Sequence, residues 1–219
     1  MIDPLAVKTA LTISIRRKQR IQELEKGDPK EIFYFLMQSL APFTTDELQI
    51  FTRTLTIERY KPGQSFIREG ELSNKVGFVL KGLFKSYTLS TKGDQHILNF
   101  CDTGFFVGSL AALTTHLPSH VTIDAIEPSI VYTAPYSIVE DLYKENSTWQ
   151  EFGRRLAEEL YIEREQKEYE YVTLTAEDRL ERLLFRYPGI ENRVSQSDLA
   201  LAIGITPTSM SRLLRQIKK

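Results

Sequence analysis

The sequence predicts an α+β protein in which an all-β unit is followed by a long helix and then by a pair of short helices. Short runs rich in β-branched and aromatic residues occupy the chain between Thr54 and Tyr136. Apolar residues at spacings of three and four follow in residues 147–160, and two amphipathic segments end the chain. These patterns divide the chain into an N-terminal arm (1–30), a β domain (31–145), a connecting helix (146–174) and a C-terminal helical domain (175–219).

Turn signals support the all-β unit. Glycine or proline dipeptides stand at Pro62-Gly63, Glu69-Gly70, Lys81-Gly82, Lys92-Gly93, Thr103-Gly104 and Glu127-Pro128. Several short strands at a spacing of roughly ten residues are typical of a β sandwich or barrel. Helical patterns precede them between Ile32 and Leu55, with a helix start at Thr45-Asp46-Glu47.

The arm is separated from the β domain by Gly27-Asp28-Pro29, because this triplet interrupts helical periodicity. Its apolar residues predict a loose helix: Leu5, Leu11, Ile15, Ile21 and Leu24. We interpret the basic run Arg16 to Arg20 as a solvated helix face, with contact to nucleic acid or to a protein partner as the alternative.

Composition limits the classes of protein to consider. A chain of 219 residues with 42% hydrophobic and 26% charged residues can bury a core in one large or two smaller domains. The net charge of −1 means that any affinity for nucleic acid must come from a local basic patch. No run approaches the roughly 18 to 20 apolar residues that cross a bilayer, so we expect no membrane partner, no export and a cytoplasmic location.

Metal and enzyme chemistry find little support in the sequence. The single Cys101 excludes a disulfide framework and a four-cysteine iron–sulfur cluster, and we interpret it as a packing residue in a reducing compartment. His116 and His120 lie four apart, but Pro118 between them favours a loop, and His96 stands in a strand-like run. No phosphate-cradling glycine loop or nucleophile elbow is present. We expect no catalytic residues, no metal and no resident cofactor.

Residues 195–204 predict the first of the two short helices. Ser195 is a capping residue, and Asp198 is placed to return the capping bond. The buried stripe consists of Leu199, Ala200 and Ile203. Gly204 ends the helix because glycine tolerates the left-handed backbone of a tight turn.

The second short helix divides into an apolar and a polar face. Thr206 caps it and Pro207 takes the first helical position. The inward face is predicted to carry Met210, Leu213, Leu214 and Ile217, and the outward face Thr208, Ser209, Ser211, Arg212 and Arg215. Small residues permit close approach to base edges, and arginines can fork onto guanine or phosphate. The pair therefore indicates a DNA-reading helix-turn-helix, with a pair of ordinary packing helices as the alternative.

These residues also carry a family resemblance. Thr175-Ala-Glu-Asp-Arg-Leu-Glu-Arg-Leu-Leu184, then Tyr187-Pro-Gly, then Ser195-Gln-x-x-Leu-Ala-x-x-Ile-Gly-Ile-Thr-Pro-x-Ser-x-Ser-Arg212 resembles the DNA-binding half of the Crp/Fnr superfamily of bacterial transcription regulators. The resemblance implies that the β domain is a cyclic-nucleotide-binding-like jelly-roll sensor. It also implies a homodimer on a palindromic double-stranded operator, with RNA polymerase as a candidate partner.

The sensor pocket departs from the family pattern. Gly108-Ser-Leu-Ala-Ala-Leu113 and the run from Pro118 occupy the place of the family's phosphate-binding cassette. Cyclic-nucleotide binders carry a glutamate and an arginine where Ser109 and Ser119 stand here. Without that arginine no full positive charge meets a cyclic phosphate, which disfavours cyclic AMP as the effector. The candidate effector residues are Gly108, Ser109, Leu110, Ser119 and His120, and an unknown small anion and a vestigial pocket both stay open.

The connecting helix carries one apolar stripe. Ser147-Thr-Trp-Gln150 is interpreted as its capping box, and the stripe consists of Trp149, Phe152, Leu156 and Leu160. This stripe packs either on the sheet of its own chain or on its copy in a dimer, and the resemblance favours the dimer. Because Glu163 to Glu168 are charged, we expect the tightest seam nearer Trp149 than Tyr169.

The functional prediction is a dimeric, sequence-specific DNA-binding transcription regulator; the alternative is a ligand-sensing or protein-interaction module that does not bind DNA. We expect Arg212 to read guanine beside Thr208 and Ser211, and Arg215, Lys218 and Lys219 to hold phosphates. The full predicted DNA contact set is Ser195, Gln196, Thr206, Pro207, Thr208, Ser209, Ser211, Arg212, Arg215 and Lys218. The sensor is expected to bias the long helices between two arrangements, of which one suits DNA.

Overall fold

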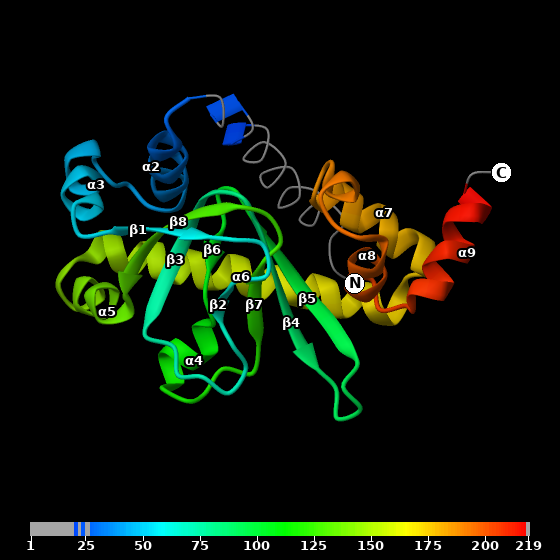
Figure 1. Cartoon of the computed structure of the whole chain (residues 1–219). Coiled ribbons are helices and arrows are strands. Elements are labelled where there is room, and N and C mark those ends of the chain that lie inside the picture. Colours follow the sequence, from blue (N-terminus) through cyan, green and yellow to red (C-terminus); the bar gives the residue numbers. More distant parts are fainter. Residues whose placement is uncertain (1–19, 22, 25–26, 218–219) are drawn as a thin grey trace.

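The β domain and the C-terminal helices lie at opposite ends of one long helix (Figure 1). The computed structural model describes residues 20, 21, 23, 24 and 27–217. The arm predicted over residues 1–30 lies mostly outside this set, as do Lys218 and Lys219. Within the described residues, Ile21 is buried against the first core cluster of the β domain.

Strands in the described part of the chain form two antiparallel four-stranded sheets that pack face to face. The first sheet has the order β1-β8-β3-β6 and the second β2-β7-β4-β5. The strands are β1 (Thr56–Tyr60), β2 (Ser65–Ile67), β3 (Lys75–Lys81), β4 (Leu83–Leu89), β5 (Gln95–Asp102), β6 (Phe106–Val107), β7 (Thr122–Ala125) and β8 (Ser129–Pro135). Side chains from both sheets, such as Val79, Phe84 and Val131, share one buried core. The predicted all-β unit is confirmed.

Helices cover the outer face of the first sheet. They are α2 (Pro29–Leu40), α3 (Thr45–Thr52), α5 (Tyr136–Glu145) and the start of α6 (Ser147–Thr173); α4 (Leu110–Thr115) lies in the connection between β6 and β7. Phe33 of α2 packs edge-on against Phe78 of β3 and Tyr132 of β8, with ring centroids 5.0 and 5.7 Å apart. These aromatic contacts seat α2 on the sheet.

The long helix α6 begins one residue earlier than predicted, with Asn146 and not Ser147 as its cap. The side-chain oxygen of Asn146 accepts hydrogen bonds from the backbone N–H groups of Thr148 and Trp149, at 2.8 and 3.3 Å. Ser147 is already helical, so the predicted Ser147 to Gln150 capping box is wrong by one position. Neither α6 nor any other helix within the described ranges has the length and apolar content to traverse a bilayer.

The predicted dimer seam is wrong for two of its four residues. Trp149 and Phe152 are only 5% and 3% exposed, because they pack inside their own chain. Trp149 meets Phe43 and Phe51 with ring centroids 4.9 and 4.6 Å apart. Their surfaces are already covered and leave nothing for a second copy. Leu156 is half-buried against the same cluster, and Leu160 is exposed at 41%.

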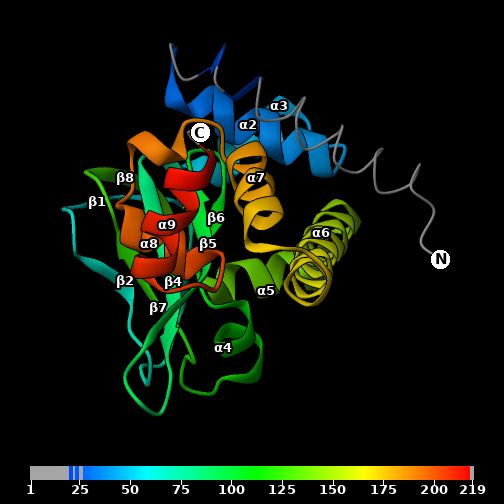
Figure 2. The same ribbon diagram turned by 90° about the vertical axis from the view of Figure 1, so that its right-hand side faces the viewer.

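The C-terminal domain, residues 175–217, packs on the outer face of the second sheet. It consists of α7 (Ala176–Arg186), the short helix η1 (Ile190–Asn192), α8 (Gln196–Ala202) and α9 (Pro207–Ile217). Its core residues Leu183, Tyr187 and Leu199 form one cluster with Ile97 and Phe100 of β5. In Figure 2, α8 and α9 lie in front of the sheet that contains β4 and β5. The two domains therefore share a buried apolar interface.

Candidate nucleic-acid interface

The first helix of the pair, α8, is capped by Ser195 and Asp198. The backbone N–H of Asp198 donates to the hydroxyl of Ser195 at 3.0 Å. The Asp198 carboxylate returns the capping bond by accepting from the Ser195 hydroxyl at 2.9 Å. Asp198 also pairs with Lys85 of β4 at 2.7 Å. The start of α8 is thus attached to the β domain.

The turn after α8 requires glycine for two reasons. Gly204 has a φ of +72°, a left-handed conformation that side chains rarely adopt. A Cβ at this position would also lie 2.5 Å from Cε1 of Tyr171 in α6. Tyr171 donates from its hydroxyl to the carbonyl of Ala202 at 2.9 Å, and Arg179 donates to the carbonyl of Ile203 at 2.9 Å. The turn is therefore held by α6 and α7.

The second helix, α9, separates its apolar and polar faces as its sequence predicts. Met210 has no exposed surface, and Leu213 and Leu214 are half-buried in the same core. Thr206 caps the helix by accepting a 3.1 Å hydrogen bond from the N–H of Ser209. The packed face orients α9 on the C-terminal domain and leaves the opposite face to solvent.

The predicted DNA-contact residues lie at the start of α8, at the cap of α9 and on the outward face of α9. Those that the structure describes are all exposed: Ser195, Gln196, Thr206, Pro207, Thr208, Ser209, Ser211, Arg212 and Arg215. Lys218 lies outside the described residues. No hydrogen bond or ion pair to another described residue engages the guanidinium of Arg212 or of Arg215. Two arginines on an exposed helix face, flanked by short side chains, suit contact with bases and phosphates in a major groove.

The predicted effector residues surround α4 and the loop that follows it. Ser109 is buried and caps α4, with its hydroxyl accepting from the N–H of Ala112 at 3.4 Å. Ser119 is buried too, and its hydroxyl donates to the carbonyl of Val121 at 2.8 Å and accepts from the Val121 N–H at 3.2 Å. Leu110 and His120 are exposed and Gly108 is half-buried. Both serine hydroxyls are engaged in local backbone contacts.

Histidine and cysteine positions give no sign of a metal centre. His116 ends α4 in a left-handed conformation, so it shares no helix with His120, and the predicted loop is confirmed. Among the residues that are described, no three histidine, cysteine or acidic side chains cluster closely enough to hold a metal ion. Burial raises the pKa of the Cys101 thiol to about 12, which is the behaviour of a packing residue.

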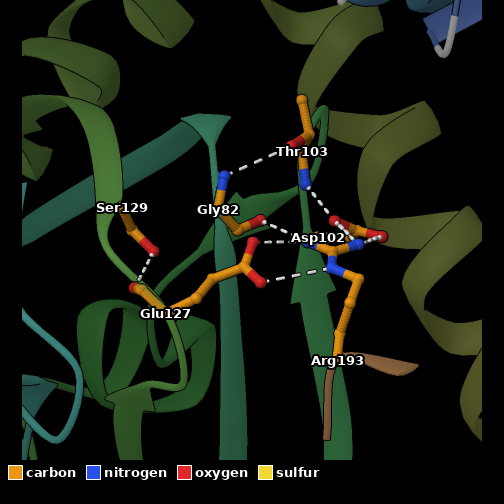
Figure 3. A network of polar contacts seen from close by, with 6 residues as sticks. All are labelled: Gly82, Asp102, Thr103, Glu127, Ser129 and Arg193. Atoms are coloured by element: carbon orange, nitrogen blue, oxygen red, sulfur yellow. Dashed lines mark hydrogen bonds and ion pairs between the residues drawn. The ribbon is translucent and has the colours of Figure 1, made fainter. Parts of the chain in front are cut away.

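Arg193 makes the main polar contact between the domains, which the sequence did not reveal. Its guanidinium donates to both carboxylate oxygens of Asp102 at 2.9 Å and to Glu127 at 2.7 and 3.3 Å (Figure 3). It also approaches the carbonyl of Gly82 at 3.4 Å. Burial alone would lower the pKa of Arg193, but the hydrogen bonds and charges of Glu127 and Asp102 outweigh it and raise the pKa.

Comparisons with known proteins agree with this architecture. The family model for the cyclic nucleotide-binding domain matches residues 57–146. The fumarate and nitrate reduction regulatory protein of Vibrio cholerae is 28% identical over 202 residues, which span 84% of this chain and 78% of that protein. Its namesake from Escherichia coli K12 is 28% identical over 203 residues, with the same shares.

Solved structures share the fold. FixK2 from Bradyrhizobium japonicum matches with a TM-score of 0.65 and 22% identity, over 75% of this chain and 84% of that chain. The c-di-GMP-responsive regulator CLP from Xanthomonas campestris also matches with a TM-score of 0.65, at 17% identity, over 80% of this chain and 92% of that chain. Together with the sheet order and the capped helix pair, these likenesses support a transcription regulator of the Crp/Fnr type.

Proposed function

We propose that the protein binds double-stranded DNA as a homodimer and reads a palindromic operator with α9. One observation carries this proposal: Met210 is fully buried, while Arg212 and Arg215 stand on the exposed face of the same helix without a partner among the described residues. Two exposed guanidinium groups beside a row of short side chains suit a helix that contacts DNA better than a helix that only packs. The named relatives are regulatory proteins, which supports a binding rather than a catalytic role.

Each residue of the face has a proposed role. Arg212 forks onto a guanine, because its planar guanidinium matches the two acceptors that guanine presents in the major groove. Thr208 and Ser211 are short enough to let the helix approach neighbouring base edges. Arg215, one turn nearer the end of α9, contacts phosphate and so contributes affinity without sequence preference.

The dimer forms along the second half of α6. After Trp149 and Phe152 are buried, apolar side chains still face solvent there, with Ile162 at 52%, Tyr169 at 54% and Val172 at 85% exposure. These three residues are spaced by seven and three positions, so they form one stripe on a straight helix. We assign the stripe to a second copy of this chain, because one recognition helix reads few base pairs and two related by a two-fold axis read a palindrome.

Cyclic AMP is not the proposed effector. The positions of the family's glutamate and arginine hold Ser109 and Ser119, whose hydroxyls are already bonded to the backbone. Neither side chain brings a positive charge to a phosphate. An effector, where one acts, shifts the protein between conformations only by binding one of them better.

Selection of bound fragments from random duplex DNA tests the proposal. The full chain is incubated with the library at moderate salt, with and without candidate metabolites, and the recovered DNA is sequenced. A two-fold symmetric motif whose half-sites lie about one helical turn apart is expected. Absence of enrichment at every salt concentration would favour a sensing or protein-interaction module. A non-symmetric motif would reject the dimer but keep the reading helix.

A further inference from the structure

We propose that Asp102, Arg193 and Glu127 form a latch that orients the reading helices of the C-terminal domain, with Arg193 as a positioning residue for DNA binding. This inference rests on the proposed function and extends it. The latch contacts no DNA itself. It acts through α8 and α9, by fixing where they stand relative to the β domain.

Arg193 of the C-terminal domain contacts three residues of the β domain, at the end of one strand and in two connections between strands. Asp102 ends β5, Gly82 lies between β3 and β4, and Glu127 lies between β7 and β8. Figure 3 shows the guanidinium of Arg193 between the two carboxylates. The Asp102 carboxylate also accepts from the N–H of Thr103 at 2.8 Å. The Glu127 carbonyl accepts from the hydroxyl of Ser129, also at 2.8 Å. A bidentate arginine in such a setting has one favoured orientation.

Arg193 is well placed to position α8. It lies between η1 and the Ser195 cap, so its bonds fix the point at which α8 begins. A second ion pair, from Lys85 to Asp198, fixes the first turn of the same helix at 2.7 Å. At the other end of α8, Tyr171 holds the carbonyl of Ala202. Because α9 packs on α8 through Met210, an α8 held at both ends determines the direction of α9.

The latch leaves the outward face of α9 accessible to DNA. Arg193, Asp102 and Glu127 lie on the side of the C-terminal domain that meets the sheet, whereas Thr208, Arg212 and the rest of the outward face of α9 remain exposed. A dimer gains from two half-sites only when both reading helices stand at a fixed separation. Holding that separation before DNA arrives reduces the conformational freedom that binding would otherwise have to remove.

The test uses two full-length variants with opposite electrostatic effects. Arg193→Gln removes a positive charge, and Asp102→Asn/Glu127→Gln removes two negative charges from the other side of the latch. Through charge alone, the first would weaken binding to any DNA and the second would strengthen it. Opening the latch is expected to weaken binding to the palindrome in both variants. Arg182→Gln is the matched control, because Arg182 is an exposed arginine of α7 outside the latch.

Dissociation constants are measured at one salt concentration on the selected palindrome, on a duplex with a single half-site, and on palindromes with altered spacing. Both latch variants are expected to lose at least about fivefold affinity for the palindrome. On the half-site duplex, the affinity of each variant changes only as its change of charge predicts, within twofold. Both variants also discriminate less between the palindrome and the palindromes with altered spacing. The control variant keeps the preference of the wild type. Arg193→Lys is expected to resemble Arg193→Gln, because one ammonium cannot replace the two nitrogens that bind Glu127 and the third that binds Asp102.

Hydrogen exchange and thermal unfolding complete the experiment. Amide exchange in α8 is expected to accelerate in both latch variants without DNA, while that of β3 and β8 stays unchanged. The triple variant Arg193→Gln/Asp102→Asn/Glu127→Gln leaves no unpaired charge in the latch. Its thermal unfolding therefore separates loss of the latch from misfolding. Unchanged palindrome affinity, a gain in affinity, or an equal loss on the half-site would overturn the latch while wild-type binding upholds the regulator. A wild type that binds no DNA refutes the proposed function itself, and unchanged α8 exchange then refutes the latch as well.

Discussion

Tyr171 of α6 lies against Gly204 so closely that a Cβ on the glycine would stand 2.5 Å from the ring atom Cε1. The same tyrosine bonds the carbonyl of Ala202, and the guanidinium carbon of Arg179 lies 5.4 Å from the centre of its ring. The turn between the two short helices is therefore attached to the end of the long helix that we assign to the dimer. A shift of α6 at the dimer seam would be passed to α8 and α9 through this contact.

Gly204→Ala is expected to destabilise the protein by more than the usual cost of a left-handed alanine, which is about 1–2 kcal/mol. The added methyl must also displace the Tyr171 ring. Gly93→Ala is the matched control, because Gly93 has a φ of +86° with open space around its missing Cβ. Urea unfolding measures both variants. Equal losses in the free energy of unfolding would show that the Tyr171 contact is unimportant.

Phe152→Ala and Val172→Asp are expected to separate folding from dimerisation. Phe152 is buried in the first core cluster, so its truncation should cost about 3–5 kcal/mol of stability. Val172 is 85% exposed in the single chain, so Val172→Asp should leave the monomer folded but shift sedimentation toward it. Ser137→Asp, at an exposed and neutral position of α5, is the control for one added negative charge. A Val172→Asp protein that sediments unchanged would place the seam elsewhere.

Cys101 is expected to resist thiol reagents in the folded protein. Its burial raises the pKa to about 12, so almost no thiolate exists at pH 7 or at pH 9. Labelling should therefore stay slow across this range, whereas an exposed cysteine would react faster as the pH rises. Denaturant should release full reactivity, measured by mass spectrometry. Rapid labelling of the native protein would mean that this part of the β core opens readily.

Local signals in the sequence were sufficient for the helix pair. The cap of Ser195, the turn at Gly204 and the cap of Thr206 each depend on residues within a few positions, so composition and spacing predict them. The β domain was predictable for a similar reason, because its turns are marked by glycine and proline. The cap of α6 was placed one residue too late, because Asn146 and Ser147 are both capping residues and stand side by side.

Longer-range relationships could not be predicted in the same way. Arg193 lies 91 positions from Asp102 and 66 from Glu127, and no local pattern connects them. The stripe of Trp149 and Phe152 had two possible partners, since a core and a dimer seam demand the same apolar spacing. Only the position of α3 and β6 shows that the chain's own aromatic residues cover that stripe. The exposed stripe of Ile162, Tyr169 and Val172 was not predicted, because charged residues separate its members in the sequence.

The most direct measurement of the central claim is a titration of wild type, Arg212→Ala and Arg215→Ala against the selected palindrome and a scrambled duplex. Arg212→Ala should lose about 1–3 kcal/mol on the palindrome, much less on scrambled DNA, and relax specificity at one position of each half-site. Arg215→Ala should weaken both duplexes alike and reduce the salt slope by about one for each phosphate that the variant no longer neutralises. Equal losses on both duplexes for Arg212→Ala would contradict the claim that α9 reads sequence.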